Sequence, residues 1–215
     1  MRRSTSGFTL IELLIVIGII GLLAAVLLPE VTATQHQFRA AADKGNLSKL
    51  GTFMVIYKQK LKHLPTEGGH KLLHSLWTTQ AVMPHTDENF ARFFTPQSEA
   101  PNFVEGMKQV KRGENPWPDL SGLTSADTDY AGRGKQYLAK MRGEDALAAT
   151  DNEGGWCLED GSVNILLGDM VNVREYSYAA LLEVFEGIPA EFNKDDPVVM
   201  VGESSPIPMC RQLDY

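Results

Sequence analysis

Residues 8–28 constrain this chain most, because they form an apolar run of 21 residues with a single charge, Glu12. A helix of about 20 apolar residues, rising about 1.5 Å per residue, crosses the hydrocarbon core of a bilayer. A carboxylate within such a helix costs roughly 2.5–3.5 kcal/mol on insertion scales and is usually functional and paired. The run supplies no cation, so we expect a positive partner for Glu12 outside this helix.

Two ordinary interpretations account for part of this segment. A cleaved secretory signal explains the basic start at Arg2 and Arg3, but such signals are shorter and are apolar where Glu12 lies. A plain signal anchor explains the length and the two arginines and leaves Glu12 unexplained. Both arginines precede the span without an acidic neighbour, so the positive-inside rule predicts a cytoplasmic Met1. The chain after Pro29 is then expected outside the bacterial inner membrane.

A third interpretation comes from the sequence Gly7-Phe8-Thr9-Leu10-Ile11-Glu12. It resembles the prepilin-peptidase site of type IV pilins and type II secretion pseudopilins, with Gly before the cut, Phe after it and Glu as the fifth residue from Phe8. Gly21 and Pro29 also lie where many of these proteins have a Gly and a helix-bending Pro. The resemblance implies cleavage between Gly7 and Phe8 and N-methylation of Phe8 by the prepilin peptidase and methyltransferase. It also implies that Glu12 pairs with the Phe8 amine of a neighbouring subunit in a filament.

The same resemblance predicts an α+β, pilin-like fold, in which a long N-terminal helix packs on a small antiparallel sheet. We expect a leader at 1–7, a transmembrane or filament-core helix at 8–28 and an amphipathic continuation at 29–62. An exported domain follows at 63–215, with an insertion around 75–150. The helical continuation is supported by a stripe spaced by three and four residues, which we expect to be a core face: Leu47, Leu50, Met54, Tyr57 and Leu61. Gly45 and Gly51 weaken this helix by about 1 kcal/mol each.

Later segments give weaker signals. Pro65-Thr66-Glu67 resembles the stretch after the long helix of the major pseudopilin, which favours secretion over an adhesive pilus. Residues 87–94 read as a short helix, 135–149 as a helix, and 178–185 as a helix. Asp160-Gly161 separates two β-favouring runs and predicts a hairpin between residues 155–158 and 163–167. We expect Trp117 to pack in the core or at a domain edge.

Two cysteines, Cys157 and Cys210, form an even count in an exported chain, which favours a disulfide. The alternative is two unpaired thiols, with Cys157 buried as a small apolar residue. No histidine pattern accompanies Cys157 that would indicate a catalytic nucleophile.

Other candidate chemistry is sparse. His70 and His74 have the spacing of two metal ligands on one helix face, but no third ligand is identifiable, so we interpret them as surface histidines. The oxygen-rich stretches 127–129 and 151–155 are candidate calcium ligands, although neither has the EF-hand pattern and no cofactor is firmly predicted. The sequence holds no phosphate-binding loop, dinucleotide turn or Ser/His/Asp signature in a recognisable context, so we do not expect an enzyme.

The net charge of the chain limits the classes of partner that it is expected to bind. The chain has 20 basic and 27 acidic residues, and removal of the leader leaves a net charge of −9, which argues against nucleic acid. Two function classes remain. The first is a structural subunit of a type II secretion pseudopilus or type IV pilus-like filament, with other pilin-like subunits and an inner-membrane assembly platform as partners. The second is a membrane-anchored exported binding or enzyme domain that uses a pilin-type anchor, favoured by the long region 75–150.

Overall fold

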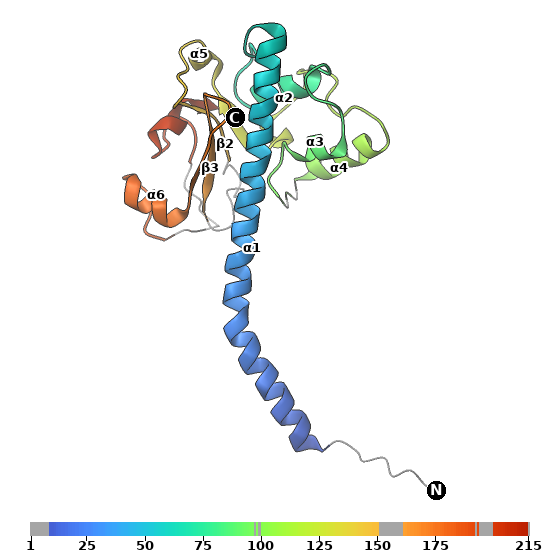
Figure 1. Ribbon diagram of the computed structural model, residues 1–215, viewed down its shortest axis with the longest axis vertical. Coiled ribbons are helices and arrows are strands. Elements are labelled where there is room, and N and C mark those ends of the chain that lie inside the picture. The colour runs from blue at the N-terminus through green and yellow to red at the C-terminus, as the bar shows by residue number, and fades with distance from the viewer. Residues whose placement is uncertain are drawn as a thin grey trace. The chain divides into compact units, whose positions relative to one another are not determined.

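The computed structural model describes residues 9–96, 98, 100–150, 161–191, 193 and 200–214. The chain divides into two compact units, Met1–Phe38 and Arg39–Tyr215. Helix α1 (Leu10–Leu61) begins in the first unit and ends in the second (Figure 1). The predicted long N-terminal helix is confirmed: α1 is one helix from Leu10 to Leu61, and it ends one residue before the expected end at 62.

The first unit exposes its apolar side chains. Leu10 is 87% exposed and Leu28 is 62% exposed, and the large apolar side chains between them are exposed as well. By length and composition α1 is able to cross a membrane. Pro29 lies inside the helix rather than at its end. Proline has no N–H to donate, and nearby the Thr32 hydroxyl donates to the Leu28 carbonyl at 3.1 Å.

The second unit is built on a five-stranded antiparallel sheet with the order β4-β3-β2-β1-β5. Its strands are β1 (Tyr130–Arg133), β2 (Ala146–Thr150), β3 (Val163–Leu167), β4 (Val173–Tyr176) and β5 (Leu213–Asp214). The helices are α2 (His70–Thr78), α3 (Asp87–Ala91), α4 (Pro101–Lys111), α5 (Lys135–Leu138) and α6 (Tyr178–Val184), with 3-10 turns at Ser125–Asp127 and Pro208–Gln212. The predicted α+β architecture, with a long helix on a small antiparallel sheet, is confirmed.

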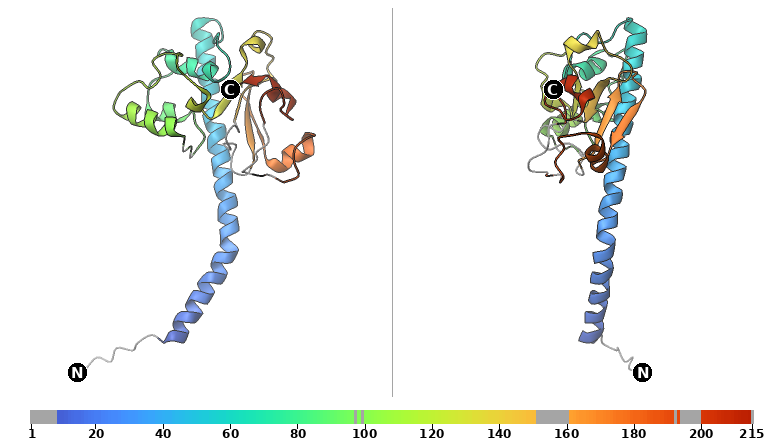
Figure 2. Two further views of the ribbon diagram at one scale, coloured as in Figure 1. Left: turned by 180° about the vertical axis from the view of Figure 1, so that it is seen from behind. Right: turned by 90° about the vertical axis from the view of Figure 1, so that its left-hand side faces the viewer.

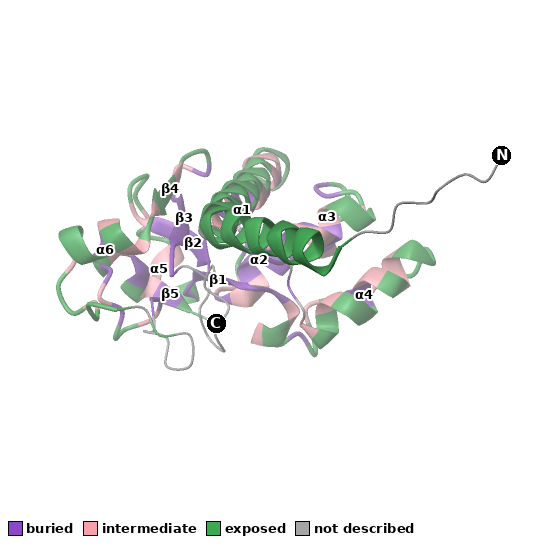
Figure 3. Cartoon of the chain, turned by 90° about the horizontal axis from the view of Figure 1, so that it is seen from below, coloured by how far each residue is buried: buried purple, intermediate pink, exposed green. Residues whose placement is uncertain are grey.

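Both faces of the sheet are covered. Leu147 and Leu166 join the residues of α1 and α2 in one apolar cluster. Ile165 and Leu167 join α6 and the C-terminal segment in a second cluster on the other face. Because successive strand residues point to opposite faces, β3 supplies both clusters. Figure 3 shows the buried residues concentrated in these strands.

The predicted apolar stripe on α1 is confirmed in four of its five members. Leu47, Leu50 and Met54 are fully buried and Tyr57 is nearly so. Leu61 was expected in the core and is 39% exposed, so that part of the prediction is wrong. Leu61 is the last residue of α1, and Lys62 after it has a φ of 67°. The helix therefore extends past the part of α1 that the core covers, and Leu61 lies beyond it.

The helix predicted over 135–149 is wrong beyond α5, because residues 146–150 form the central strand β2. The segment Ala-Leu-Ala-Ala-Thr has good local helix propensity, but propensity is a weak preference that packing overrides. Every residue of β2 is buried, and its alanines leave room for the two layers that cover the sheet. Strand β3 forms as predicted and pairs with β2 and β4. The other predicted hairpin strand, 155–158, lies outside the described residues.

The region 75–128 packs around a group of buried aromatic rings. The short helix expected at 87–94 is present as α3 but ends at Ala91. It places Phe90 against Trp117, with ring centroids 4.6 Å apart. Trp77 also contacts Trp117, with centroids 5.7 Å apart. Trp117 is only 5% exposed, so of the two predicted places, the core or a domain edge, it lies in the core. The helix predicted at 178–185 is present as α6.

Two glycines of α1 provide a matched stability test. A Cβ at Gly51 would lie 2.5 Å from the Met170 carbonyl oxygen, whereas a Cβ at Gly45 would have no neighbour within 4 Å. Alanine improves helix propensity by about 1 kcal/mol at either site, and overpacking a core contact costs about 1–3 kcal/mol. We expect Gly45→Ala to raise the free energy of unfolding and Gly51→Ala to lower it. Urea unfolding of the detergent-solubilised full chain measures both, and stabilisation by Gly51→Ala would contradict the close approach.

Candidate assembly site

Glu12 lies in the first turn of α1, where it is held by its own chain. Its Oε2 accepts hydrogen bonds from the Thr9 backbone N–H at 2.9 Å and from the Thr9 hydroxyl at 2.7 Å. In return the Glu12 N–H donates to Thr9 Oγ1 at 3.3 Å. This reciprocal pair is a capping box, which satisfies donors that a helix N-terminus otherwise leaves unpaired. Sequence reasoning missed the role of Thr9, although the spacing Thr-x-x-Glu could have revealed it.

The cap supplies dipoles to the carboxylate and no positive charge. Glu12 is exposed, as are the apolar side chains that follow it in the helix. When lipid or another helix covers the apolar side chains around Glu12, its carboxylate needs a positive partner. An unpaired charge in an apolar setting is strongly unfavourable. Gly7 and Phe8, the two residues of the predicted cleavage site, lie outside the described residues. The ion pair between Glu12 and the Phe8 amine therefore stays a prediction.

The second unit fastens α1 to its sheet through a buried carboxyl group. Asp43 is fully buried. Tyr130 Oη donates to Asp43 Oδ1 at 2.6 Å, while Thr150 Oγ1 and Asn164 Nδ2 donate to Oδ2 at 2.8 and 2.7 Å. Burial raises the pKa of Asp43, and hydrogen bonds from Tyr130, Asn164 and Thr150 oppose the shift while the Asp129 charge adds to it. One side chain of α1 thus bonds to β1, β2 and β3.

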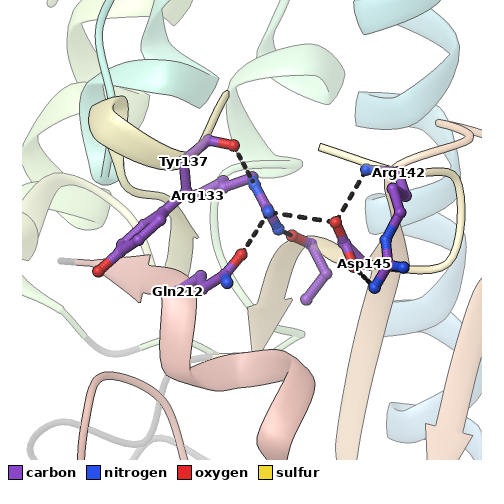
Figure 4. Close-up of polar contacts among 6 residues, drawn as sticks. Arg133, Tyr137, Arg142, Asp145 and Gln212 are labelled. Carbon is purple, nitrogen blue, oxygen red and sulfur yellow. Dashed lines mark hydrogen bonds and ion pairs between the residues drawn. The ribbon is translucent and has the colours of Figure 1, made fainter. Parts of the chain in front are cut away.

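A buried guanidinium lies at the other end of β1 from Tyr130 (Figure 4). Arg133 in β1 is 1% exposed. Its Nε donates to the Tyr137 carbonyl at 3.0 Å and its Nη1 to the Ala146 carbonyl at 2.8 Å. Its Nη2 lies 3.3 Å from Asp145 Oδ2 and also donates to Gln212 Oε1. These bonds join β1 to β2 and to the C-terminal segment, so Arg133 has a structural role.

His74 lies in the core, so the interpretation as a surface residue is wrong for His74, whereas His70 is half-buried. His74 is fully buried, and its ring lies 4.4 Å from Trp117 and 5.1 Å from Phe93, between centroids. Its two ring nitrogens face the carbonyls of His70 and Asp127 at 2.8 and 3.2 Å. Burial lowers the pKa of His74 to about 4, so the ring is neutral at physiological pH. Both nitrogens face protein carbonyls, which leaves neither directed at a metal.

The candidate calcium ligands at 127–129 are engaged by protein donors. Asp127 Oδ2 accepts from the Thr124 N–H at 2.9 Å, and Asp129 Oδ2 accepts from the Thr95 N–H and hydroxyl at 2.9 Å each. Across the part of the chain that the structure describes, no three His, Cys, Asp or Glu side chains gather as a metal site. The second candidate stretch, 151–155, lies outside the described residues.

The predicted disulfide also falls partly outside that region. Cys210 is fully buried in the second apolar cluster, on the sheet face that α6 and the C-terminal segment cover. Burial raises the pKa of its thiol to about 12, so a reduced Cys210 is a poor nucleophile. Cys157 lies outside the described residues, and its pairing with Cys210 stays a prediction.

The first comparison with known proteins concerns the N-terminal segment. The family model described as the prokaryotic N-terminal methylation motif matches residues 2–28. The match covers most of the expected leader, the expected cleavage site, Glu12 and the apolar run. The match shows that residues 2–28 are similar to this N-terminal motif.

Two curated relatives are similar to the chain beyond this motif, and both are named type II secretion system core protein G. The chain is 39% identical to the one from Pseudomonas aeruginosa over 57 residues, which is 26% of this chain and 40% of that protein. It is 28% identical to the one from Klebsiella michiganensis over 159 residues, which is 73% of this chain and 96% of that protein. The chain thus spans less than half of the first relative and nearly all of the second. No solved structure is significantly similar to the chain.

Proposed function

We propose that the chain is a structural subunit of a type II secretion pseudopilus that assembles through its N-terminal helix. The observation that carries the proposal is a capped, exposed Glu12 at the start of an apolar helix, inside a matched methylation motif. The two relatives named core protein G favour the secretion pseudopilus over a pilus. In the described part of the second unit, the buried Asp43, Arg133 and His74 contact other groups of the fold, which is the pattern of structural residues.

In this proposal prepilin peptidase cleaves between Gly7 and Phe8 in the inner membrane, and the new Phe8 amine is methylated. The amine stays cationic at neutral pH and pairs with Glu12 of a neighbouring copy. The apolar side chains of residues 10–28, which face the lipid in the single-pass membrane form, pack against those of other copies in the filament. The N-terminus faces the cytoplasm, and the second unit lies on the periplasmic side, where an inner-membrane platform drives assembly.

A zero-length cross-link tests this function directly. A membrane-permeant carbodiimide joins an amine to a carboxylate only where the two groups are paired. We expect a covalent link between the Phe8 nitrogen of one copy and Glu12 of another in membranes that contain the assembly machinery. Mixing isotopically heavy and light chains makes the linked peptide a heavy–light hybrid in about half of the events. Mature chains that give only light–light and heavy–heavy peptides would indicate a lone membrane anchor.

A further inference from the structure

The C-terminal end of α1 is positively charged and surrounds an exposed apolar side chain. From residue 44 to residue 66 the sequence has five lysines and no acidic residue. Three of these lysines, Lys58, Lys60 and Lys62, flank Leu61, which is 39% exposed. Lys60 donates to the Ala81 carbonyl. Within the described part of the chain, no ion pair involves Lys58 or Lys62. We call these four residues the basic end.

Helix α6 carries the opposite charge around apolar side chains of its own. Val184 is 61% exposed and Leu182 is 38% exposed. Glu183 lies in the last turn of α6, and Glu186 follows the helix by two residues. Carboxylates at a helix C-terminus are unfavourable, because that end already carries partial negative charge. The last turn of α6 has no basic residue, and no ion pair to either glutamate occurs among the described residues. We call these four residues the acidic end.

The lysines at the end of α1 have a local explanation, because cations favour a helix C-terminus. The glutamates at the end of α6 have no such local explanation. A cationic partner would offset the unfavourable interaction of their carboxylates with the helix C-terminus. That partner is not the basic end of the same chain. Figures 1 and 2 show α6 at the end of the second unit that is remote from the C-terminal end of α1. The two surfaces therefore meet only when they belong to different copies.

We infer that the acidic end of one copy docks on the basic end of a second copy. Val184 and Leu182 contact Leu61, and Glu183 and Glu186 pair with Lys58 and Lys62. This inference rests on the proposed filament function and adds the surface through which the second units associate. The contact joins two different patches, so it is heterologous. After two copies dock, one still has a free basic end and the other a free acidic end, so further copies can add at both sides. Such head-to-tail contacts propagate into open filaments when their rotation does not close a ring.

Paired cysteines test the contact. We expect Leu61→Cys chains mixed with Val184→Cys chains to give a bismaleimide-linked dimer, whereas either variant alone gives none. The double variant, which carries both cysteines, is expected to give a ladder of higher oligomers, because each copy reacts at both ends. Val104→Cys paired with Leu61→Cys is the matched control, since Val104 is similarly exposed, at 46%, but lies on α4. The unmodified chain controls for reactions of Cys157 and Cys210.

Charge reversal separates this contact from chance collision. We expect Glu183→Lys with Glu186→Lys to lower the yield of the linked dimer by about tenfold, because like charges then face each other. Lys58→Glu with Lys62→Glu is expected to do the same, and mixing the two reversed chains should restore the yield. Raising the salt from about 0.05 to about 0.5 M should weaken the original pair, since exposed charges are screened.

The outcomes distinguish this contact from the proposed function. Loss of the Leu61–Val184 product in chains that still form the Phe8–Glu12 cross-link would overturn the docking surface and leave the filament standing. The Leu61–Val184 product without the Phe8–Glu12 cross-link would keep the surface and contradict assembly through the N-terminal helix. Equal yields from the Val104 control pair would also overturn the docking surface.

Discussion

Replacing Glu12 with alanine is expected to reduce filament yield by about a hundredfold or more, while membrane insertion and leader cleavage continue. Insertion becomes easier, because the one charge in the apolar run is gone. Assembly fails because the Phe8 amine of the neighbouring copy then lacks its counter-ion, and one charge left unpaired in an apolar setting costs about 3–5 kcal/mol. Filaments counted by electron microscopy, together with the carbodiimide cross-link, measure the effect. A normal filament yield from Glu12→Ala would contradict the ion-pair role.

Thr9→Val is the matched control for Glu12, because Glu12 also caps α1. The substitution removes the hydroxyl that donates to Glu12 Oε2 and leaves the carboxylate and the Thr9 backbone N–H in place. Loss of a cap costs about 1 kcal/mol, so we expect a modest decrease in filament yield. If Thr9→Val reduced assembly as strongly as Glu12→Ala, the effect of Glu12 would come from capping rather than from the neighbouring copy.

Arg133→Met is expected to lower the free energy of unfolding of the second unit by about 3–5 kcal/mol, because it breaks a buried pair and leaves Asp145 without its buried partner. Gln212 and the Tyr137 and Ala146 carbonyls lose their donor at the same time. Arg142→Met removes the other arginine that pairs with Asp145, at 3.6 Å. The Arg142 side chain is 76% exposed, and exposed pairs contribute only about 0–1 kcal/mol.

Urea unfolding of the full chain in detergent micelles, followed by tryptophan fluorescence, measures both arginine variants. The three tryptophans lie in the second unit, so the signal reports that unit. We expect a large shift of the unfolding midpoint for Arg133→Met and a small one for Arg142→Met. Similar midpoints for the two variants would contradict the assignment of Arg133 as the residue that holds β1, β2 and the C-terminal segment together.

The elements that could be predicted from the sequence are those whose signal is local. The apolar run and the three-and-four spacing of Leu47, Leu50 and Met54 are fixed by helix periodicity alone, and α1 follows both. Strand β3 follows from its β-favouring composition next to a Gly turn. In each case the residues that form the pattern also form the contacts, so no knowledge of distant segments is needed.

The predictions from sequence are wrong where contacts with a distant segment determine the local structure or the burial of a side chain. Residues 146–150 favour a helix locally but become the central strand, because β1 and β3 pair with them on both sides. His74 is buried by Phe93 and Trp117, which come from other parts of the chain. The Asp43 network joins residues 87 to 121 positions apart in sequence. Spacing within a short window carries no information on such partners.

The candidate assembly site shows the same division. Glu12 stood out by its cost in an apolar run, which is a local property. The capping of Glu12 by Thr9 is also local, and the spacing Thr-x-x-Glu predicts it. Leu61 was misassigned to the core because helix periodicity does not say where the rest of the fold ends, and that exposed residue is now part of the proposed docking surface.

The most direct test of the central claim is the mass of the mature N-terminal peptide, from chains expressed with prepilin peptidase. Cleavage after Gly7 is expected to shorten the protein by seven residues and to leave Phe8 with one added methyl group on its nitrogen. The Phe8 amine that Glu12 requires exists only after this cut. An N-terminal peptide that begins at Phe8 and carries N-methylation supports the account, whereas a mature chain that retains Met1 would contradict it.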